Sequence, residues 1–485
     1  MIAVAVVTAL LLPLGCTASL ASRDPTDVCK QIAGAISDVS DVYYPLSIQY
    51  AQDNKHWMGS SSQTSACSVE PGTAEDVGKI LEIVGSTNTS FAVKGGGHAS
   101  NVGFSSTTGV MISMTRFSNV TLSEDKSTVD VGAGLVWDDV YDALDGTGVN
   151  VVGGRVAGVG VAGFALGGGY SWKTSQYGLT SDNIAAFELV LPNGTVRTVT
   201  ADDDDLYFAL RGGFNNFGIV TNFKLNTHAQ PDTIWGGTLV FTGDQLPAVS
   251  LAIANFSANN TDRRAMALPT YNSAIGIPGG SVIVFYDGPS PPDGIFDALL
   301  AIPALSSGVQ THTFSEFVSS FPAELAAPTR GAFMSCSVLD FTPAILDRIT
   351  NLTLEYGTKL LLLDSAYFLS FDIEPFDHDL LTHGSASAWP PDRSRGYLPL
   401  NLYFAWTLPS ADEAIWQAMK DVVANVTALA VEEGQNVDGV ALYANYALAD
   451  TTLEAIYGEN VERLKAIHAD VDPENVMGLS GGFKF

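Results

Sequence analysis

A ten-residue loop, residues 94–103, constrains this chain more than any other segment. It follows the apolar run Phe91-Ala92-Val93 and reads Lys-Gly-Gly-Gly-His-Ala-Ser-Asn-Val-Gly. Three consecutive glycines permit backbone angles that other residues avoid, and they let a ligand approach main-chain N–H groups closely. The pattern predicts a turn that holds the phosphates of a cofactor, with the imidazole of His98 at the cofactor's reactive end. A tight turn with an incidental histidine is the simpler alternative.

A second glycine cluster favours the cofactor loop over the simple turn. Residues 163–170 read GFALGGGY. The overlapping run 158–163 fits the dinucleotide pattern G-x-G-x-x-G, with Asp182 near the expected acidic offset. That fold needs the last glycine to open a helix. Here three more glycines follow closely, and each costs about 1 kcal/mol inside a helix. We therefore expect a second cofactor loop rather than a dinucleotide-type helix.

Seven motifs follow one another along the chain. They are Ala66 to Pro71, the loop 94–103, Val131 to Gly134 with Trp137, Gly167 to Gly169, Tyr177 to Asn183, Arg211 to Val220, and Tyr443 to Tyr446. Together they resemble the berberine bridge enzyme-like group of the vanillyl-alcohol oxidase superfamily, over nearly the whole chain after its first 22 residues. The resemblance implies FAD as cofactor, a small-molecule or saccharide substrate, and molecular oxygen as electron acceptor.

The fold class expected is α+β. The first part, residues 23–230 with its core at 63–230, should be a bipartite FAD-binding domain of PCMH type, built from two α/β subdomains. Residues 231–430 should form an inserted substrate-binding domain, an antiparallel sheet flanked by helices, because long apolar strands alternate there with helical stretches. Residues 431–485 should return to the FAD domain, as the resemblance implies.

Local patterns predict individual elements within these domains. The expected elements are a helix from Ala74 capped by Thr73, strands over 110–114 and 127–131, a helix over 137–144, a hairpin turning at 192–194, strands over 237–241, 281–286 and 400–406, and helices over 411–423 and 460–468.

The resemblance implies that His98 is bonded through its ring to the 8α-methyl group of the flavin. Many relatives add a second bond from a cysteine, but that position is Val156 here, so His98 should be the only attachment. A histidine that is hydrogen-bonded within its loop is the alternative. The other expected cofactor contacts, each of which could equally be an ordinary turn or core residue, are Lys94, Gly95, Gly96, Gly97, Ala99, Ser100, Asn101, Gly103, Ala165, Gly167, Gly168, Tyr170, Asp182, Asn183, Gly218, Val220 and Asn445.

Two positions near the second loop bear on reactivity. Phe164 stands where many relatives have a histidine that faces the flavin pyrimidine, so another donor such as Asn445 or a backbone amide would have to support the reduced flavin. Ala165 matches a position whose bulk controls oxygen access in the family. Its small side chain favours an oxidase.

Tyr446 is the expected catalytic base, with Tyr443 as the second candidate. Both belong to the motif Tyr-X-Asn-Tyr. On a strand, residues 443 and 446 would point to opposite faces, so both tyrosines could not face the flavin without a bulge. An aromatic packed at the domain boundary is the alternative. Partners for the base are guesses in the middle domain, namely Asp364, Tyr367, Asp372 and Tyr403.

The net charge of −29 and the absence of any basic run exclude a nucleic-acid partner. Residues 2–13 are almost wholly apolar, and the segment is too short to span a membrane, which indicates that residues 1–22 form a secretory signal peptide. We expect a secreted monomer without membrane association. Seven Asn-X-Ser/Thr sequons support glycosylation; their asparagines are Asn88, Asn119, Asn193, Asn255, Asn259, Asn351 and Asn425.

The cysteines fit the same compartment. Cys16 leaves with the signal peptide, Cys29 and Cys67 would form one disulfide, and Cys336 remains as a buried thiol. Without a Cys-X-X-Cys pair, we expect no zinc or iron–sulfur site. Two other functions stay open: a flavin dehydrogenase or oxidative cyclase of secondary metabolism, and a flavin-fold protein without a catalytic role.

Overall fold

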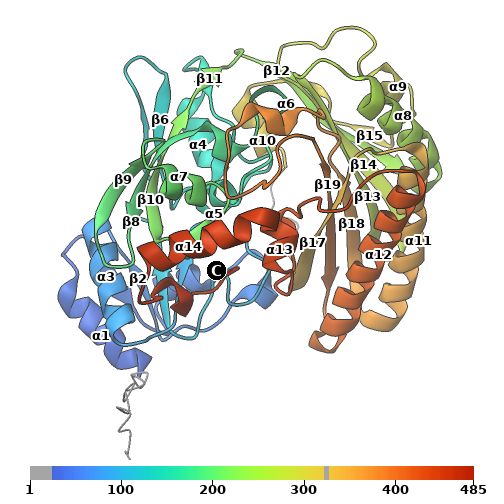
Figure 1. Ribbon diagram of the computed structural model, residues 1–485. Coiled ribbons are helices and arrows are strands. Elements are labelled where there is room, and N and C mark those ends of the chain that lie inside the picture. The colour runs from blue at the N-terminus through green and yellow to red at the C-terminus, as the bar shows by residue number, and fades with distance from the viewer. Residues whose placement is uncertain (1–23, 322–326) are drawn as a thin grey trace, which may run out of the picture.

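The computed structural model describes residues 24–321 and 327–485, so the expected signal peptide, residues 1–22, lies outside the described residues. Two halves face each other, and helices α13 and α14 cross in front of the space between them (Figure 1). The first half holds two small sheets, and the second holds one large sheet. The expected α+β fold class is confirmed.

The first small sheet carries the glycine-rich loop at the end of a strand. Its order is β1 (Asp41–Tyr43), β2 (Cys67–Glu70), β4 (Val110–Ser113) and β3 (Phe91–Lys94), and the last three strands run parallel. Helices α1 (Pro25–Ala35) and α3 (Ala74–Ser86) accompany it. The predicted cap of α3 is confirmed, because the Thr73 side chain accepts a hydrogen bond from the Asp76 amide.

The second small sheet is antiparallel. Its order is β5 (Val120–Leu122), β6 (Thr128–Gly132), β10 (Ile219–Asn226), β8 (Ile184–Val190) and β9 (Val196–Thr200). The predicted hairpin is the β8–β9 pair, and the helix expected over 137–144 is α4 (Trp137–Leu144). Close by lie α6 (Thr174–Tyr177), α7 (Asp204–Leu210) and the two-stranded pair β7 (Val149–Asn150) and β11 (His228–Ala229).

The large sheet is antiparallel, and its outer face is covered by helices (Figure 1). Its order is β15 (Ser306–Ser307), β12 (Ile234–Thr242), β14 (Ile277–Tyr286), β13 (Ala265–Ala274), β18 (Ala366–Ile373), β19 (Leu398–Trp406) and β17 (Arg330–Val338), with β16 (Gln310–His312) also paired to β12. The main covering helices are α8 (Leu246–Asn259), α11 (Pro343–Asp364) and α12 (Asp412–Glu432). The inner face is turned toward the first half.

The C-terminal segment returns to the first half. Helix α13 (Leu453–Tyr457) leads into α14 (Val461–Val471), which packs against α7. Beyond α14, Ser480 forms a parallel bridge with Phe91, the first residue of the strand that leads into the glycine-rich loop. The C-terminal segment therefore packs beside the strand that carries the glycine-rich loop.

The predicted disulfide and the predicted buried thiol are confirmed, whereas Cys16 lies outside the described residues. Cys29 of α1 and Cys67 of β2 form a disulfide, and Cys336 is buried and free. Six of the seven sequon asparagines are exposed; the half-buried exception, Asn425, accepts a hydrogen bond from Arg348 and donates one to the Asp421 carbonyl. Within the described ranges, no helix is both long and apolar enough to cross a bilayer.

Candidate active site

The main chain of the first glycine-rich loop lies directly against the main chain at Gly160, just before helix α5 (Val161–Leu166). A Cβ added to Gly96 would lie 2.5 Å from the Cα of Gly160, and one added to Gly95 would lie 3.0 Å from the Ala133 carbonyl. Gly97 has φ +70°, which side-chain-bearing residues rarely adopt. Gly95 and Gly96 are therefore required by the close approach of neighbouring backbone and Gly97 by its backbone angle, whereas the predicted approach of a ligand stays a prediction.

The second cluster forms a short helix and then a left-handed turn. Helix α5 (Val161–Leu166) ends at Gly167, and Gly163 lies inside it rather than at its start. Gly168 and Gly169 have φ +114° and +89°. The three glycines thus stop the helix, which agrees with the exclusion of a dinucleotide-type helix. A Cβ on Gly168 would collide with the Trp389 ring at 2.8 Å.

His98 follows the first loop with its ring held flat against Trp57. The ring centroids lie 4.3 Å apart at an interplanar angle of 19°, and the Trp57 amide donates to the Gly97 carbonyl. The buried Nδ1 of His98 has no hydrogen-bond partner among the described residues. Burial lowers the pKa of His98 to about 4, so the ring is neutral at pH 7. An orphaned ring nitrogen beside a glycine cradle fits a bound flavin.

Other expected loop contacts lie around His98. Lys94 donates through Nζ to the Gln52 carbonyl at 3.2 Å, and Asn101 donates through Nδ2 to the Ala447 carbonyl at 2.9 Å. Asn101 therefore ties the loop to the residue after Tyr446. The half-buried Ala99, Ser100 and Gly103 complete the loop.

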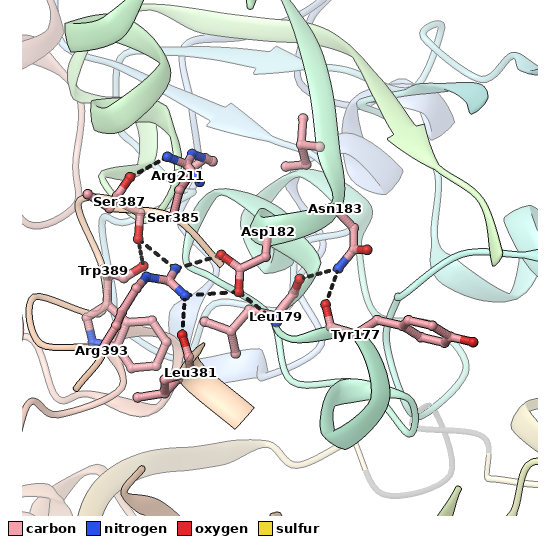
Figure 2. Close-up of polar contacts among 12 residues, drawn as sticks. Tyr177, Leu179, Asp182, Asn183, Arg211, Leu381, Ser385, Ser387, Trp389 and Arg393 are labelled. Carbon is pink, nitrogen blue, oxygen red and sulfur yellow. Dashed lines mark hydrogen bonds and ion pairs between the residues drawn. The ribbon is translucent and has the colours of Figure 1, made fainter. Parts of the chain in front are cut away.

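Asp182 and Asn183 are held by protein partners (Figure 2). Both Asp182 oxygens accept hydrogen bonds from Arg393, the shorter at 2.6 Å. Asn183 donates to the Tyr177 and Leu179 carbonyls. These contacts give both residues a structural role, and their contact with a cofactor stays a prediction. So does that of the buried Gly218 and Val220, which lie next to and within β10.

The positions around α5 pack tightly. Ala165 is buried, and the Phe164 ring lies edge-on against Trp137 at 5.4 Å. Asn445 donates to the Phe164 carbonyl at 3.3 Å, and a Cβ on Gly167 would lie 2.5 Å from Asn445 Oδ1. Asn445 thus lies directly on the second glycine loop, where a donor near the flavin was expected. Tyr170 and the half-buried Val156 lie in adjoining segments.

The Tyr-X-Asn-Tyr motif is not a strand, so the expectation that its two tyrosines point apart is wrong. Residues Ala444–Tyr446 form a 3₁₀ turn, η8. The tighter repeat brings the rings of Tyr443 and Tyr446 together, with centroids 4.8 Å apart. The Tyr443 hydroxyl accepts from the Gly169 amide at 3.1 Å and from Asn445 Nδ2 at 2.7 Å.

Tyr446 meets a buried ion pair. Its hydroxyl donates to Glu374 Oε1 at 2.9 Å and accepts from Arg155 Nη2 at 2.8 Å, and Arg155 also bonds Glu374 at 2.7 Å. Glu374 is 1% exposed. Burial and the Glu374 carboxylate raise the pKa of Tyr446 well above its usual value, against the opposing effect of Arg155. Tyr446 is therefore a protonated phenol that can pass its proton to Glu374.

The inner face of the large sheet carries polar side chains at this point. Along β18, the apolar Leu369, Phe371 and Ile373 share one face, and Ser370 and Asp372 alternate with them and so share the opposite face. Asn401 of β19 lies opposite Asp372 and donates to it at 2.9 Å. Burial raises the pKa of the Asp372 carboxyl to about 6.

The guessed partners of the base are partly right in location. Asp372 and Tyr403 lie on this inner face, since Tyr403 pairs with Ser370 across the strands, whereas Asp364 ends α11 on the outer side. Tyr367 lies one residue inside β18.

The Tyr446 hydroxyl forms its hydrogen bonds with Glu374 and Arg155. Neither residue was among the four partners that the sequence suggested for the base. Glu374 lies 72 residues and Arg155 291 residues before Tyr446 in the chain. Neither stands in a pattern that marks a partner of a distant tyrosine. The single signal in the sequence that could have pointed to Arg155 is its place directly before Val156, the expected cysteine position.

Comparisons with known proteins agree with this geometry. Residues 65–200 match the family described as FAD binding domain, and residues 442–480 match the family described as berberine and berberine like. The chain is 30% identical to the FAD-dependent monooxygenase tpcD of Cochliobolus heterostrophus, over 94% of each chain. It is 37% identical to an uncharacterized FAD-linked oxidoreductase of Arthroderma benhamiae, over 56% of each.

A solved structure shows the same fold. Glucooligosaccharide oxidase from Acremonium strictum, described as carrying 6-S-cysteinyl, 8α-N1-histidyl FAD, matches with a TM-score of 0.74 at 20% identity. The match covers 93% of this chain and 98% of that one.

Proposed function

The chain belongs to the berberine bridge enzyme-like FAD-linked oxidoreductases, and we propose that it is a secreted oxidase with FAD bound covalently through His98 alone. The substrate would be a small molecule or saccharide with an oxidisable hydroxyl group. The observation that carries this proposal is the hydrogen-bonded set of Tyr446, Glu374 and Arg155 beside the glycine loops. The exposed sequons support secretion.

Oxidation of an alcohol removes a hydride from carbon and a proton from oxygen. The two glycine-rich loops and His98 would hold FAD, which would supply the hydride acceptor and, through reoxidation by oxygen, hydrogen peroxide. Tyr446 accepts the substrate hydroxyl proton while its own proton passes to Glu374 Oε1, which lies 2.9 Å from the Tyr446 oxygen. Because the phenol is already protonated, the two transfers are linked. Arg155 keeps its charge and holds both oxygen atoms in place.

His98 supports the single attachment. Its buried Nδ1 has no hydrogen-bond partner among the described residues, and Val156 cannot form a thioether. Acid-denatured, washed protein should stay yellow, and a tryptic peptide that contains His98 should carry the flavin mass. Release of all flavin by acid, or flavin on a peptide without His98, would contradict this assignment.

The electron acceptor is tested separately, because the relative from Cochliobolus heterostrophus is named a monooxygenase. Oxygen consumption across sugars, alcohols and phenolics should reveal a substrate. An oxidase releases one hydrogen peroxide per oxygen consumed, whereas a monooxygenase places label from ¹⁸O₂ in the organic product. Slow reoxidation of the dithionite-reduced protein in air would indicate the dehydrogenase or cyclase alternative.

A further inference from the structure

The chain between β18 and β19, residues 374–397, lies against the FAD-binding half, although both strands belong to the large sheet. We call it the crossover segment. The Ala388 amide donates to the Phe208 carbonyl at 3.0 Å, and the Trp389 amide donates to the Arg211 carbonyl at 3.2 Å. The crossover segment is therefore hydrogen-bonded to the end of α7 by main-chain groups.

A buried ion pair anchors the crossover segment beside these bonds (Figure 2). The side chains of Arg393 and Asp182 are 12% and 1% exposed. Arg393 also donates to Ser387 Oγ at 2.8 Å, and that hydroxyl donates to the Trp389 carbonyl at 2.8 Å. A Cβ on Gly384 would lie 2.1 Å from Asp182 Oδ1, so the Asp182–Arg393 pair requires glycine at position 384. Removing one member of such a pair leaves an uncompensated buried charge.

The Trp389 side chain joins two parts of the site. Its ring lies against Gly168 of the second glycine loop, and its centroid is 5.0 Å from that of Tyr443. Its Nε1 donates to the Leu442 carbonyl at 3.1 Å. Leu442 directly precedes the Tyr-X-Asn-Tyr motif. A single buried indole thus contacts the cofactor loop and fixes the chain that enters the catalytic turn.

We propose that Trp389 is a positioning residue: anchored by the Asp182–Arg393 pair, it holds the 443–446 turn against the second glycine loop and so places the Tyr446 hydroxyl on Glu374. Replacing the indole by a phenyl ring removes one tether of the turn, the N–H bond to the Leu442 carbonyl, together with the fused-ring atoms that face Gly168. The Tyr446 hydroxyl then spends less time in line with its proton acceptor. The kinetic consequence rests on the proposed function, whereas the structural consequence does not.

The test replaces Trp389 by phenylalanine and compares it with Trp406→Phe. Trp406 is a matched control, because it is 1% exposed and its Nε1 donates to Asp412 Oδ1 at 2.8 Å, on a side chain outside the site. Hydrogen exchange at the amides of residues 443–447 should be about tenfold faster in Trp389→Phe, the effect expected for one lost buried hydrogen bond. Trp406→Phe should leave exchange there unchanged.

The second readout is anaerobic reduction of the bound flavin by substrate. Trp389→Phe should keep full flavin content and reduce about tenfold more slowly, with KM nearly unchanged, because alignment rather than binding is affected. If Trp389→Phe and Trp406→Phe alter exchange at 443–447 equally, or neither does, the proposal is overturned. If no substrate reduces the wild-type protein, the proposed function fails, and the exchange comparison still decides the role of Trp389.

A second variant tests the same proposal in case Trp389→Phe does not fold. Asp182→Asn keeps the indole and weakens its anchor, so exchange at 443–447 should rise in the same direction by a smaller factor of about three. Unchanged exchange in a folded Asp182→Asn protein would overturn the anchoring role.

Discussion

The two sides of the active site are built in different ways. The cofactor side consists of main chain brought into direct contact, as where Gly96 meets Gly160 and where Gly168 takes a left-handed angle. The side that we propose for the substrate consists of side chains that stand on one face of the large sheet, such as Asp372 and Asn401. Close contact between main-chain segments can be recognised in the sequence, because only glycine permits it. The partner of a polar side chain on a strand cannot be recognised in the sequence in this way.

The comparison predicts its largest effect at Gly96. Gly96→Ala places a methyl group 2.5 Å from the Gly160 Cα, and a backbone atom cannot move aside as a flexible side chain can. The two loops must separate, so the purified protein should hold less than about a tenth of the wild-type flavin and lose about 1–3 kcal/mol of stability. Visible absorbance and chemical denaturation measure the two effects. Normal flavin content would show that the loop contact is not needed for cofactor binding.

The next effect concerns the side-chain half of the site. Tyr446→Phe keeps the ring and removes the hydroxyl that bonds Glu374, so flavin content should stay normal. Reduction of the flavin by substrate should slow on the order of 10²-fold or more, the usual effect of a lost acid–base group. Stopped-flow mixing without oxygen measures the rate. If the rate equals that of the wild type, the base lies elsewhere, and Tyr443 or an inner-face carboxylate becomes the better candidate.

A smaller effect follows from the buried carboxyl of Asp372. Its pKa of about 6 lies above the ordinary 3.8, so the folded protein binds this proton more tightly than the unfolded chain does. The resulting stability is complete below about pH 4 and is lost as the pH rises through about 6. Asp372→Asn stays neutral throughout. Relative to wild type it should gain up to about 3 kcal/mol between pH 4 and pH 7.

Denaturant unfolding of both proteins across that pH range measures this difference. A constant difference would mean that Asp372 titrates normally, and the inner face would then be more hydrated than its burial indicates.

The smallest effect is expected at Gly103. It distinguishes a glycine that is required by its backbone angle from one that is required by close contact. Gly103 has φ +86°, yet an added Cβ would meet nothing within 4 Å. Gly103→Ala should therefore cost about 1–2 kcal/mol for the left-handed angle alone and leave flavin content unchanged. Its unfolding free energy can be compared directly with that of Gly96→Ala. Loss of flavin in Gly103→Ala would contradict the distinction between contact and angle.

Much of the fold could be predicted because its signals are local. The Thr73 cap, the helix at 137–144 and the hairpin at 192–194 depend on neighbouring residues, and all are present. The misjudged element was the Tyr443–Tyr446 motif, which was treated as part of a strand. Tertiary packing against the Gly169 amide and Phe164 carbonyl instead holds a 3₁₀ turn. Such contacts, 274 and 281 residues distant in the chain, are invisible to a local pattern.

The sequence by itself determined the cofactor side: the glycine loops, His98 after them, and the lack of a cysteine at Val156. It did so because close backbone approach restricts residue type. Only the tertiary structure decided which groups meet the Tyr446 hydroxyl. Arg155, Glu374 and Tyr446 come from three separate segments, and the bonds among them exist because the large sheet is docked on the FAD-binding half. A carboxylate or guanidinium can satisfy many partners, so its partner is set by where the fold places it.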